Sequence, residues 1–257
     1  MKKRIFMISL VIVVLVLLNI PVRSAYVAPI LMYHKIDAAE SLISKIAISP
    51  ETFQRQMEFL YRNKYNVIPL TELIELISKG EKIPHNTVCI TFDDGYENNY
   101  TKAFPILEEY NLPATIFIIV DFVGKPGYLS RRQLKELGDS KTITLGSHTS
   151  THPVLTKIDK KYFKKEIVDS KGRLDIRVAK SVELFSYPLG AFDENVRKAV
   201  IDAGYSGAVV TNLGKDYPRD DIYALRRVRI SESSANMFVF WIETSGYYTF
   251  IKERRDD

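Results

Sequence analysis

Val88-Cys89-Ile90-Thr91-Phe92-Asp93-Asp94-Gly95 is a nearly continuous apolar run that ends in two carboxylates and a glycine. A run of this kind predicts a β-strand buried on both faces, as in a parallel sheet covered by helices. In parallel α/β folds, functional groups gather at the carboxyl ends of the strands, which is where Asp93 and Asp94 fall. The stretch therefore predicts a fold class and the edge of the sheet that holds the functional site.

Further β-type runs alternate with helical segments along the rest of the chain. The predicted strands cover residues 30–33, 67–68, 88–92, 115–120, 142–145, 183–187, 207–211 and 225–230. Helix starts are expected at Ser49-Pro50, Thr71 and Ser130, and helices also fit residues 101–109, 159–178, 194–203 and 235–244. This alternation predicts a single α/β domain with a parallel sheet, and it leaves open whether the sheet is open or closed into a barrel.

The second informative motif is His148-Thr149-Ser150-Thr151-His152-Pro153, which follows the predicted strand 142–145. The spacing of four residues would place both imidazoles on one side of a helical turn, where they can share a cation. Alone, an Asp-Asp-Gly sequence is often only a turn, and a histidine pair can be surface decoration. Because both motifs follow strands, we expect them to meet at one rim together with His34, which ends the first strand.

The residue types at this rim indicate metal-assisted hydrolysis. Two imidazoles and one carboxylate suit zinc, and three protein ligands leave one position open for water. We expect Asp94, His148 and His152 to bind one divalent metal ion, with zinc preferred, and Asp93 to act as general base on the water. Non-haem iron oxygenases use the same donor types, but a second adjacent carboxylate has no purpose there.

The N-terminus predicts export. Lys2-Lys3-Arg4 precedes an uncharged apolar stretch at residues 5–20, so residues 1–28 are interpreted as a signal peptide or a signal anchor and residues 29–257 as the domain. The protein is then secreted, or anchored to the outer face of the cytoplasmic membrane. Four of the 36 basic residues precede Ala25, which leaves 32 against 31 acidic residues and gives no support to a nucleic-acid partner. The single cysteine, Cys89, excludes an intrachain disulfide and is expected to be buried.

These residues resemble the polysaccharide deacetylases, carbohydrate esterase family four, which carry the NodB-homology domain. The motifs that carry the resemblance are residues 29–34, 91–96, 103–107, 112–115, 146–153, 187–190 and 225–228. The resemblance implies a distorted (β/α)7-type barrel that removes N-acetyl groups from amino sugars. It implies the roles given above for Asp93, Asp94, His148 and His152, and it assigns the backbone N–H of Leu189 to the oxyanion.

Two positions depart from the family pattern. Ser186 stands where the family commonly has an arginine that orients the catalytic aspartate. Candidate replacements in the last strand are Arg226, Arg227 and Arg229. No histidine follows His152, so the late histidine that usually acts as general acid is missing. His34 is the candidate general acid, as in the exported poly-N-acetylglucosamine deacetylases that the chain resembles, and a histidine that fixes the first strand by hydrogen bonds is the alternative.

The sequence thus predicts an exported, monomeric hydrolase that acts on N-acetylglucosamine units of a cell-surface or biofilm polysaccharide. An O-acetyl esterase acting on a glycan and a non-catalytic glycan-binding relative are the alternatives. Tyr96, Tyr128 and Phe192 are candidates for stacking on sugars, although packing is the commoner role of such rings. Trp241 is expected to lie in the core or in helix packing, and His85 in a loop at the opposite end of the sheet.

Overall fold

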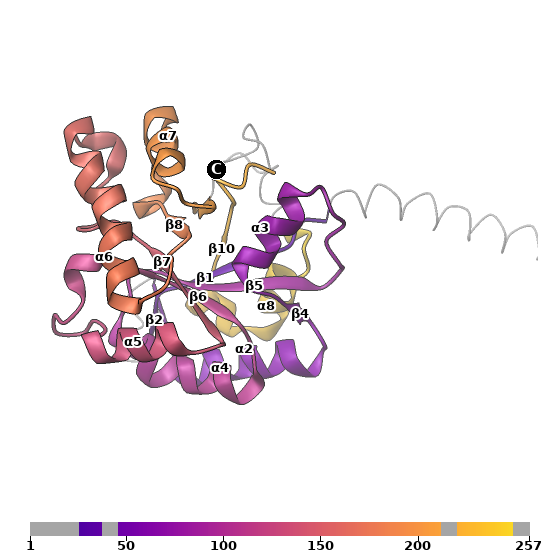
Figure 1. Ribbon diagram of the computed structural model, residues 1–257. Helices are drawn as coiled ribbons and strands as arrows, with labels where there is room; N and C mark the ends of the chain where they lie inside the picture. The colour runs from indigo at the N-terminus through magenta and orange to yellow at the C-terminus, as the bar shows by residue number, and fades with distance from the viewer. Residues whose placement is uncertain (1–25, 38–45, 212–219, 249–257) are drawn as a thin grey trace, which may run out of the picture.

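The structure is a computed structural model that describes residues 26–37, 46–211 and 220–248 (Figure 1). The predicted signal segment, up to residue 25, lies outside these residues. The described strands are β1 (Ile30–Tyr33), β2 (Lys35–Ile36), β3 (Ala47–Ile48), β4 (Asn66–Val67), β5 (Thr87–Phe92), β6 (Ala114–Ile118), β7 (Ile143–Ser147), β8 (Leu184–Ser186), β9 (Gly207–Val209) and β10 (Val228–Arg229). In these parts of the chain, no helix is long and apolar enough to cross a membrane.

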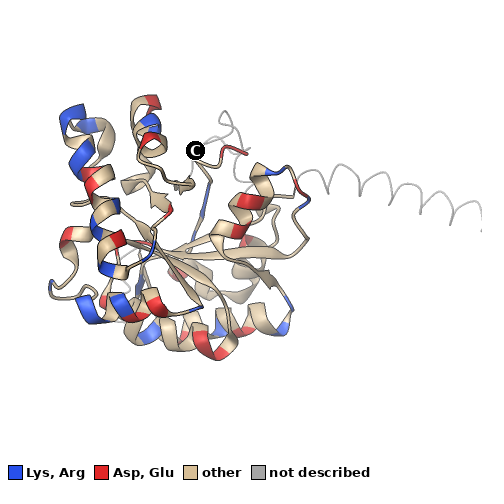
Figure 2. Ribbon diagram, viewed as in Figure 1, with Lys and Arg blue, Asp and Glu red and all other residues tan. Residues whose placement is uncertain are grey.

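The described α-helices are α2 (Pro50–Arg62), α3 (Leu70–Ser78), α4 (Phe104–Tyr110), α5 (Arg131–Asp139), α6 (Asp169–Val178), α7 (Glu194–Asp202) and α8 (Met237–Glu243). Two begin as the sequence predicts. Ser49 caps α2 by accepting a hydrogen bond from the Thr52 N–H, and Ser130 forms a capping box with Gln133 at the start of α5. Charged residues are concentrated in the helices and loops, and the central strands contain few of them (Figure 2).

The main sheet is parallel and has the strand order β10-β1-β5-β6-β7-β8-β9, with β4 paired to β5. The segment that leads into β10 also pairs with β9 at the far end of this order. Leu225 forms a parallel bridge with Val209, and the Arg227 N–H donates to the Thr211 carbonyl. Residues 225–229 therefore join both ends of the sheet and close it into an irregular barrel.

Alternation along the strands separates an outer and an inner face. Val88, Ile90 and Phe92 of β5 belong to the core cluster that packs under α2, α4 and α5. Cys89 belongs to a second cluster, which α3 covers with Leu70, Leu73 and Ile74. Because side chains alternate with period two, Thr91 and Asp93 follow Cys89 on the inner face. The strand register pairs Met32 with Thr91, which brings the end of β1 beside the end of β5.

Several element predictions are wrong in detail. The helix expected to start at Thr71 begins at Leu70, directly after Pro69. The helix expected at 159–178 is divided into a 3-10 turn at Lys160–Tyr162, a π-helical turn η6 at Lys164–Val168, and α6. The two-residue strands β2 and β3 pair only with each other and are too short to give a periodic signal in the sequence.

Candidate active site

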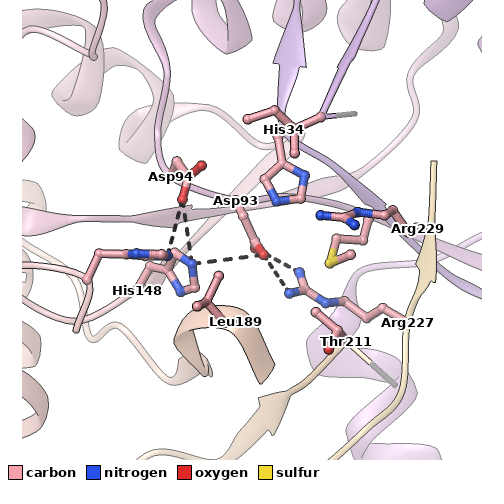
Figure 3. Close-up of a pocket in the computed structure, with 11 residues that line it drawn as sticks. His34, Asp93, Asp94, His148, Leu189, Thr211, Arg227 and Arg229 are labelled. Carbon is pink, nitrogen blue, oxygen red and sulfur yellow. Dashed lines mark hydrogen bonds and ion pairs between the residues drawn. The ribbon is translucent and has the colours of Figure 1, made fainter. Parts of the chain in front are cut away.

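The predicted site residues converge on one pocket at the carboxyl ends of the strands (Figure 3). The pocket has a volume of about 600 Å³. Its lining includes all six residues predicted from the sequence: His34, Asp93, Asp94, His148, His152 and Leu189. The pocket also contains Arg227, which directly precedes β10, and Arg229 of β10. The residues expected at the carboxyl ends of the strands therefore lie together, because β1, β5, β7, β8 and β10 all end at this rim.

Asp94 and the two histidines form a group that could hold a metal ion. The Oδ1 atom of Asp94 lies 3.6 Å from Nε2 of His148 and 3.7 Å from Nε2 of His152. The three ligand atoms all lie within 4.8 Å of one another. Tetrahedral zinc with bonds of about 2.0–2.1 Å separates its ligand atoms by roughly 3.3 Å, so the donor set and its spacing fit such an ion.

The loop that carries the histidines is not helical, which corrects the helical turn expected from their spacing. Thr149 and His152 have positive φ angles of 68° and 63°. The His152 N–H donates to the Thr149 hydroxyl at 2.9 Å, and this bond closes the turn. The rings of His148 and His152 lie 4.7 Å apart because the left-handed backbone folds the loop back on itself.

Hydrogen bonds around the ligands orient them for a cation. The Nδ1 atom of His148 lies 2.7 Å from the Ser186 carbonyl, which can only accept, so Nδ1 carries the proton and Nε2 faces Asp94. Burial lowers the pKa of both His148 and His152, which favours the neutral, ligating form. Burial raises the pKa of Asp94, and the neighbouring Asp93 charge adds to this effect. The nearby hydroxyl of Tyr96 acts in the opposite direction and lowers the pKa of Asp94.

Asp93 lies beside this group but has different partners. Arg227 grips both of its oxygens, with Nη1 at 2.7 Å from Oδ1 and Nη2 at 2.6 Å from Oδ2. The Ser186 hydroxyl accepts a hydrogen bond from Nη2 of Arg227 at 3.0 Å. Burial by itself would raise the pKa of Asp93, but the Arg227 guanidinium holds it well below its usual range. The arginine therefore favours the ionised form of Asp93.

Arg227 is the arginine that replaces the one missing at Ser186. The sequence named it as one of three candidates, and the structure selects it because Arg227 lies on the inner face of the closing segment. The small Ser186 side chain leaves room for the guanidinium, which also donates to the Val210 carbonyl at 3.0 Å through Nε. Arg229 lines the pocket next to His34 (Figure 3).

His34 lies at the end of β1 with its ring in the pocket (Figure 3). Among the described residues, its Nδ1 atom is buried without a hydrogen-bond partner. The strand end is instead fixed through the backbone, since the Asn99 side chain donates to the His34 carbonyl at 2.7 Å. Burial lowers the pKa of His34 to about 4, with Asp93 opposing the shift. The ring is therefore neutral at neutral pH.

Leu189 follows β8 on the opposite side of the pocket from His34 (Figure 3). Its φ angle is 56°, in the left-handed region, and the turn is completed by Gly190 at 71°. The Leu189 side chain is 68% exposed at the pocket entrance. A β-carbon on Gly190 would lie 2.8 Å from the Thr211 backbone nitrogen, so this turn packs tightly against the end of β9.

The aromatic residues singled out in the sequence are mainly packed against other rings. Tyr96 and Tyr128 stack on each other with centroids 5.1 Å apart, and Phe192 stacks on Tyr187 at 4.8 Å. Of the two places expected for Trp241, the core is wrong, whereas its ring does pack within helix α8, with its centroid 5.6 Å from that of Phe238. Trp241 is 49% exposed, because Phe240, one position earlier on α8, takes the buried face.

Comparison with known proteins identifies the family. The sequence profile described as polysaccharide deacetylase matches residues 80–208, which is half of the chain. A Bacillus subtilis protein named as polysaccharide deacetylase YxkH is 34% identical over 217 residues, which are 84% of this chain and 76% of that protein. The chain belongs to the polysaccharide deacetylase family. The prediction that it is a hydrolase of this family is confirmed.

Other relatives agree with the fold and the family. A poly-beta-1,6-N-acetyl-D-glucosamine N-deacetylase of Staphylococcus epidermidis is 27% identical over 205 residues, covering 75% of this chain and 71% of that protein. The Streptococcus pyogenes deacetylase PplD, solved in complex with acetate, aligns with a TM-score of 0.74 at 26% identity and covers 90% of this chain and 100% of that chain. The predicted distorted (β/α)7-type barrel is therefore confirmed.

Proposed function

We propose that this enzyme removes acetyl groups from N-acetylglucosamine units of a cell-surface or biofilm polysaccharide, with one divalent cation as cofactor. The observation that carries the proposal is that the adjacent carboxylates of Asp93 and Asp94 have different partners. Asp94 faces two neutral imidazoles, and Asp93 is held apart by Arg227. The similarity to a poly-beta-1,6-N-acetyl-D-glucosamine N-deacetylase supports an N-acetylated glycan as substrate.

Asp94, His148 and His152 would hold the cation, and zinc suits their donor atoms best. A divalent cation bound there lowers the pKa of water and polarises the acetamide carbonyl oxygen. The Ser186 carbonyl fixes the ring of His148. Loss of such an outer partner typically costs about 10–100-fold in metal affinity.

Asp93 is assigned as the general base that takes a proton from the attacking water. Arg227 fixes the orientation of the carboxylate through two hydrogen bonds and keeps it ionised. The same contact makes Asp93 a weak base, so the assignment requires a water that has already been made more acidic. The Oδ2 atom of Asp93 lies toward the metal ligands, 4.0 Å from Nε2 of His148.

His34 is assigned as the general acid that protonates the leaving amine. Its pKa of about 4 means that the neutral ring must first gain a proton while substrate is bound. Once protonated, a ring of such low pKa gives the proton up readily, which favours transfer to an amine. The buried Nδ1 atom without a partner argues against the alternative in which the His34 ring only fixes the strand.

The backbone N–H of Leu189 is assigned to the developing oxyanion. The left-handed turn at Leu189 and Gly190 holds this part of the backbone at the pocket wall opposite His34. The backbone N–H is available as a donor whichever side chain the residue carries, so leucine at this position is compatible with the role. The exposed leucine side chain would then contact the sugar at the pocket entrance.

Acetate release by the full-length chain tests the proposal. The substrates are poly-β-1,6-N-acetylglucosamine, chitin oligomers and peptidoglycan, with O-acetylated xylan as the ester alternative. We expect release from an N-acetylated glycan, a loss of about 100-fold or more after chelation, and recovery on addition of zinc. Release from the O-acetylated glycan alone, or N-deacetylation that persists after exhaustive chelation, would contradict the proposal.

We also propose that residues 1–28 direct export of the enzyme, as the basic and apolar N-terminal sequence indicates. Cell fractionation with N-terminal sequencing separates the two forms of this proposal. A mature chain that begins near Ala25 indicates cleavage, and an intact N-terminus in the membrane fraction indicates an anchor. An intact chain in the cytoplasm would contradict export.

A further inference from the structure

The two metal-ligating histidines are held in different ways. The ring of His148 is fixed by the Ser186 carbonyl. The backbone N–H of His148 donates to the Ile118 carbonyl at 2.8 Å and so continues the hydrogen bonds between β7 and β6. His152 lies four residues beyond, in a turn that has left β7 and contains two positive φ angles. Its side chain is 27% exposed, against 2% for His148. The position of His152 therefore depends on what holds the turn.

A buried glutamate holds this turn from outside the pocket. Glu166 accepts two hydrogen bonds from Thr151, one from the backbone N–H at 2.8 Å to Oε2 and one from the hydroxyl at 2.9 Å to Oε1. Thr151 directly precedes His152. The carboxylate thus grips the main chain one residue from a metal ligand, and both of its oxygens are used.

Glu166 is placed by a rigid support. It belongs to the π-helical turn η6, a rare conformation that is frequent at functional sites. The next residue, Ile167, is fully buried, and the Tyr205 hydroxyl donates to its carbonyl at 3.0 Å. Ser150, one position before Thr151, donates through its hydroxyl to the Lys165 carbonyl at 2.8 Å. Three consecutive residues of η6 are therefore tied to the histidine loop or to the core.

Burying a glutamate carboxylate costs free energy unless hydrogen bonds compensate for the lost water. Glu166 is only 4% exposed, and a buried carboxylate is tolerated when it accepts strong hydrogen bonds. A threonine in an exposed turn does not need a buried charge to satisfy its N–H, because water would do so. The cost of burying Glu166 is explained if the exact position of the following residue matters.

We infer that Glu166 is a positioning residue for the metal ligand His152, acting through its two hydrogen bonds to Thr151. The inference rests on the proposed function, because it presumes that His152 binds a cation. It predicts that loss of the carboxylate grip weakens metal binding by allowing the turn at residues 149–152 to move, with Asp94 and His148 left in place.

Zinc affinity of the full-length chain tests the inference, measured by competition with a chromophoric chelator. We expect Glu166→Ala to raise the zinc dissociation constant by about 10–100-fold. Glu166→Gln should recover most of this loss. Its amide oxygen can accept from the Thr151 N–H, and its amide nitrogen can donate to the Thr151 hydroxyl in the reverse direction.

Asp175→Ala is the matched control for a general loss of stability. Asp175 lies on α6, which continues η6, and its carboxylate also accepts a hydrogen bond from a backbone N–H, that of Val182. It does not contact the histidine loop. This variant should lower the thermal midpoint of the metal-free protein and leave the zinc dissociation constant within about twofold of the wild-type value, well below the change expected for an outer metal partner.

Thr151→Val provides a second route if Glu166→Ala fails to fold. It removes the hydroxyl and keeps the shape of the side chain. We therefore expect the zinc dissociation constant to rise by only about 3–10-fold, less than the effect of losing an outer partner completely. Zinc affinities of Glu166→Ala or Thr151→Val equal to that of Asp175→Ala would overturn the inference. A wild-type chain that binds no zinc would instead refute the proposed function, so the two failures are distinguishable.

Discussion

Asp93 and Asp94 are adjacent in the chain, yet they belong to two halves of the pocket with opposite character (Figure 3). In the acid–base half, Asp93 is paired with the Arg227 guanidinium, and His34 lies nearby. In the metal half, Asp94 faces the rings of His148 and His152, which burial keeps neutral. Asp93 thus forms an ion pair with an arginine, whereas Asp94 faces two neutral imidazoles.

Backbone geometry produces this difference. Asp93 continues the inner face of β5, as Cys89 and Thr91 do, so it meets the arginine of the closing segment. Asp94 has a φ angle of 76° and Gly95 one of 71°, so the chain leaves the strand and turns the second carboxylate toward the histidine loop. Two identical side chains thus acquire different partners and opposite pKa shifts from a single turn.

The largest expected effect separates the two halves directly. Asp94→Asn should lower acetate release by about 10³-fold or more because the cation is lost. Asp93→Asn should lower kcat by about 10²–10⁴-fold because the base is lost. Adding excess zinc should recover part of the Asp94→Asn activity and none of the Asp93→Asn activity. Recovery of both variants, or of neither, would remove the distinction between the halves.

Arg227→Met should reduce kcat by about 10²-fold, the lower range for a misplaced acid–base group. Without the guanidinium, burial raises the pKa of Asp93, so the acid limb of the pH–rate profile should move to higher pH. The free energy of unfolding should also fall by about 3–5 kcal/mol, because the buried charge of Asp93 loses its partner. Arg227→Lys is the control, because it keeps the charge and loses the two-point grip. An unchanged acid limb in Arg227→Met would show that Arg227 does not set the ionisation of Asp93.

His34→Gln should lower turnover of an N-acetylated glycan by about 10²-fold without changing metal content. The effect should depend on the leaving group. Deacetylation of 4-nitrophenyl acetate releases a phenolate that needs no proton, so His34→Gln should change its rate by less than about threefold, far below the effect of a lost proton donor. Equal losses on both substrates would show that His34 acts in another way.

The smallest expected effect concerns stability of the metal-free enzyme in acid. The pKa of His34 is about 4 in the folded state, below the ordinary histidine value of 6.5. The unfolded chain therefore binds the proton first as the pH falls, and stability is lost between pH 6.5 and about 4. His34→Gln should reduce this loss by about 2–3 kcal/mol, as measured by urea unfolding at both pH values. An unchanged slope would contradict the buried, neutral state of the ring.

The residues of the metal half could be expected to meet because they belong to two local motifs. Asp94 follows the apolar strand β5, His148 and His152 follow β7, and parallel strands bring their carboxyl ends together. The two histidine rings lie side by side, but not through the helical turn that was expected. The spacing of four residues works here through a turn with left-handed residues, and sequence spacing alone does not distinguish this from a helix.

The acid–base half was harder to predict because its members meet only when the barrel closes. Arg227 lies close to two other arginines, Arg226 and Arg229. Which of the three reaches Asp93 depends on which face of the segment leading into β10 is turned inward. Alternation alone would have separated Arg226 from the other two, but not Arg227 from Arg229. Glu166 gave no signal at all, because its partner Thr151 is distant in sequence and the π-helical turn that places it has no recognisable pattern.

Metal content of three purified chains tests the central claim most directly. Wild type, Asp93→Asn and Asp94→Asn are each dialysed against the same low concentration of zinc, and bound metal is measured per chain. The account predicts one ion per chain in wild type and in Asp93→Asn, with little or none retained by Asp94→Asn. Equal metal content in all three chains, or loss of the ion from Asp93→Asn, would contradict the division of labour between the two carboxylates.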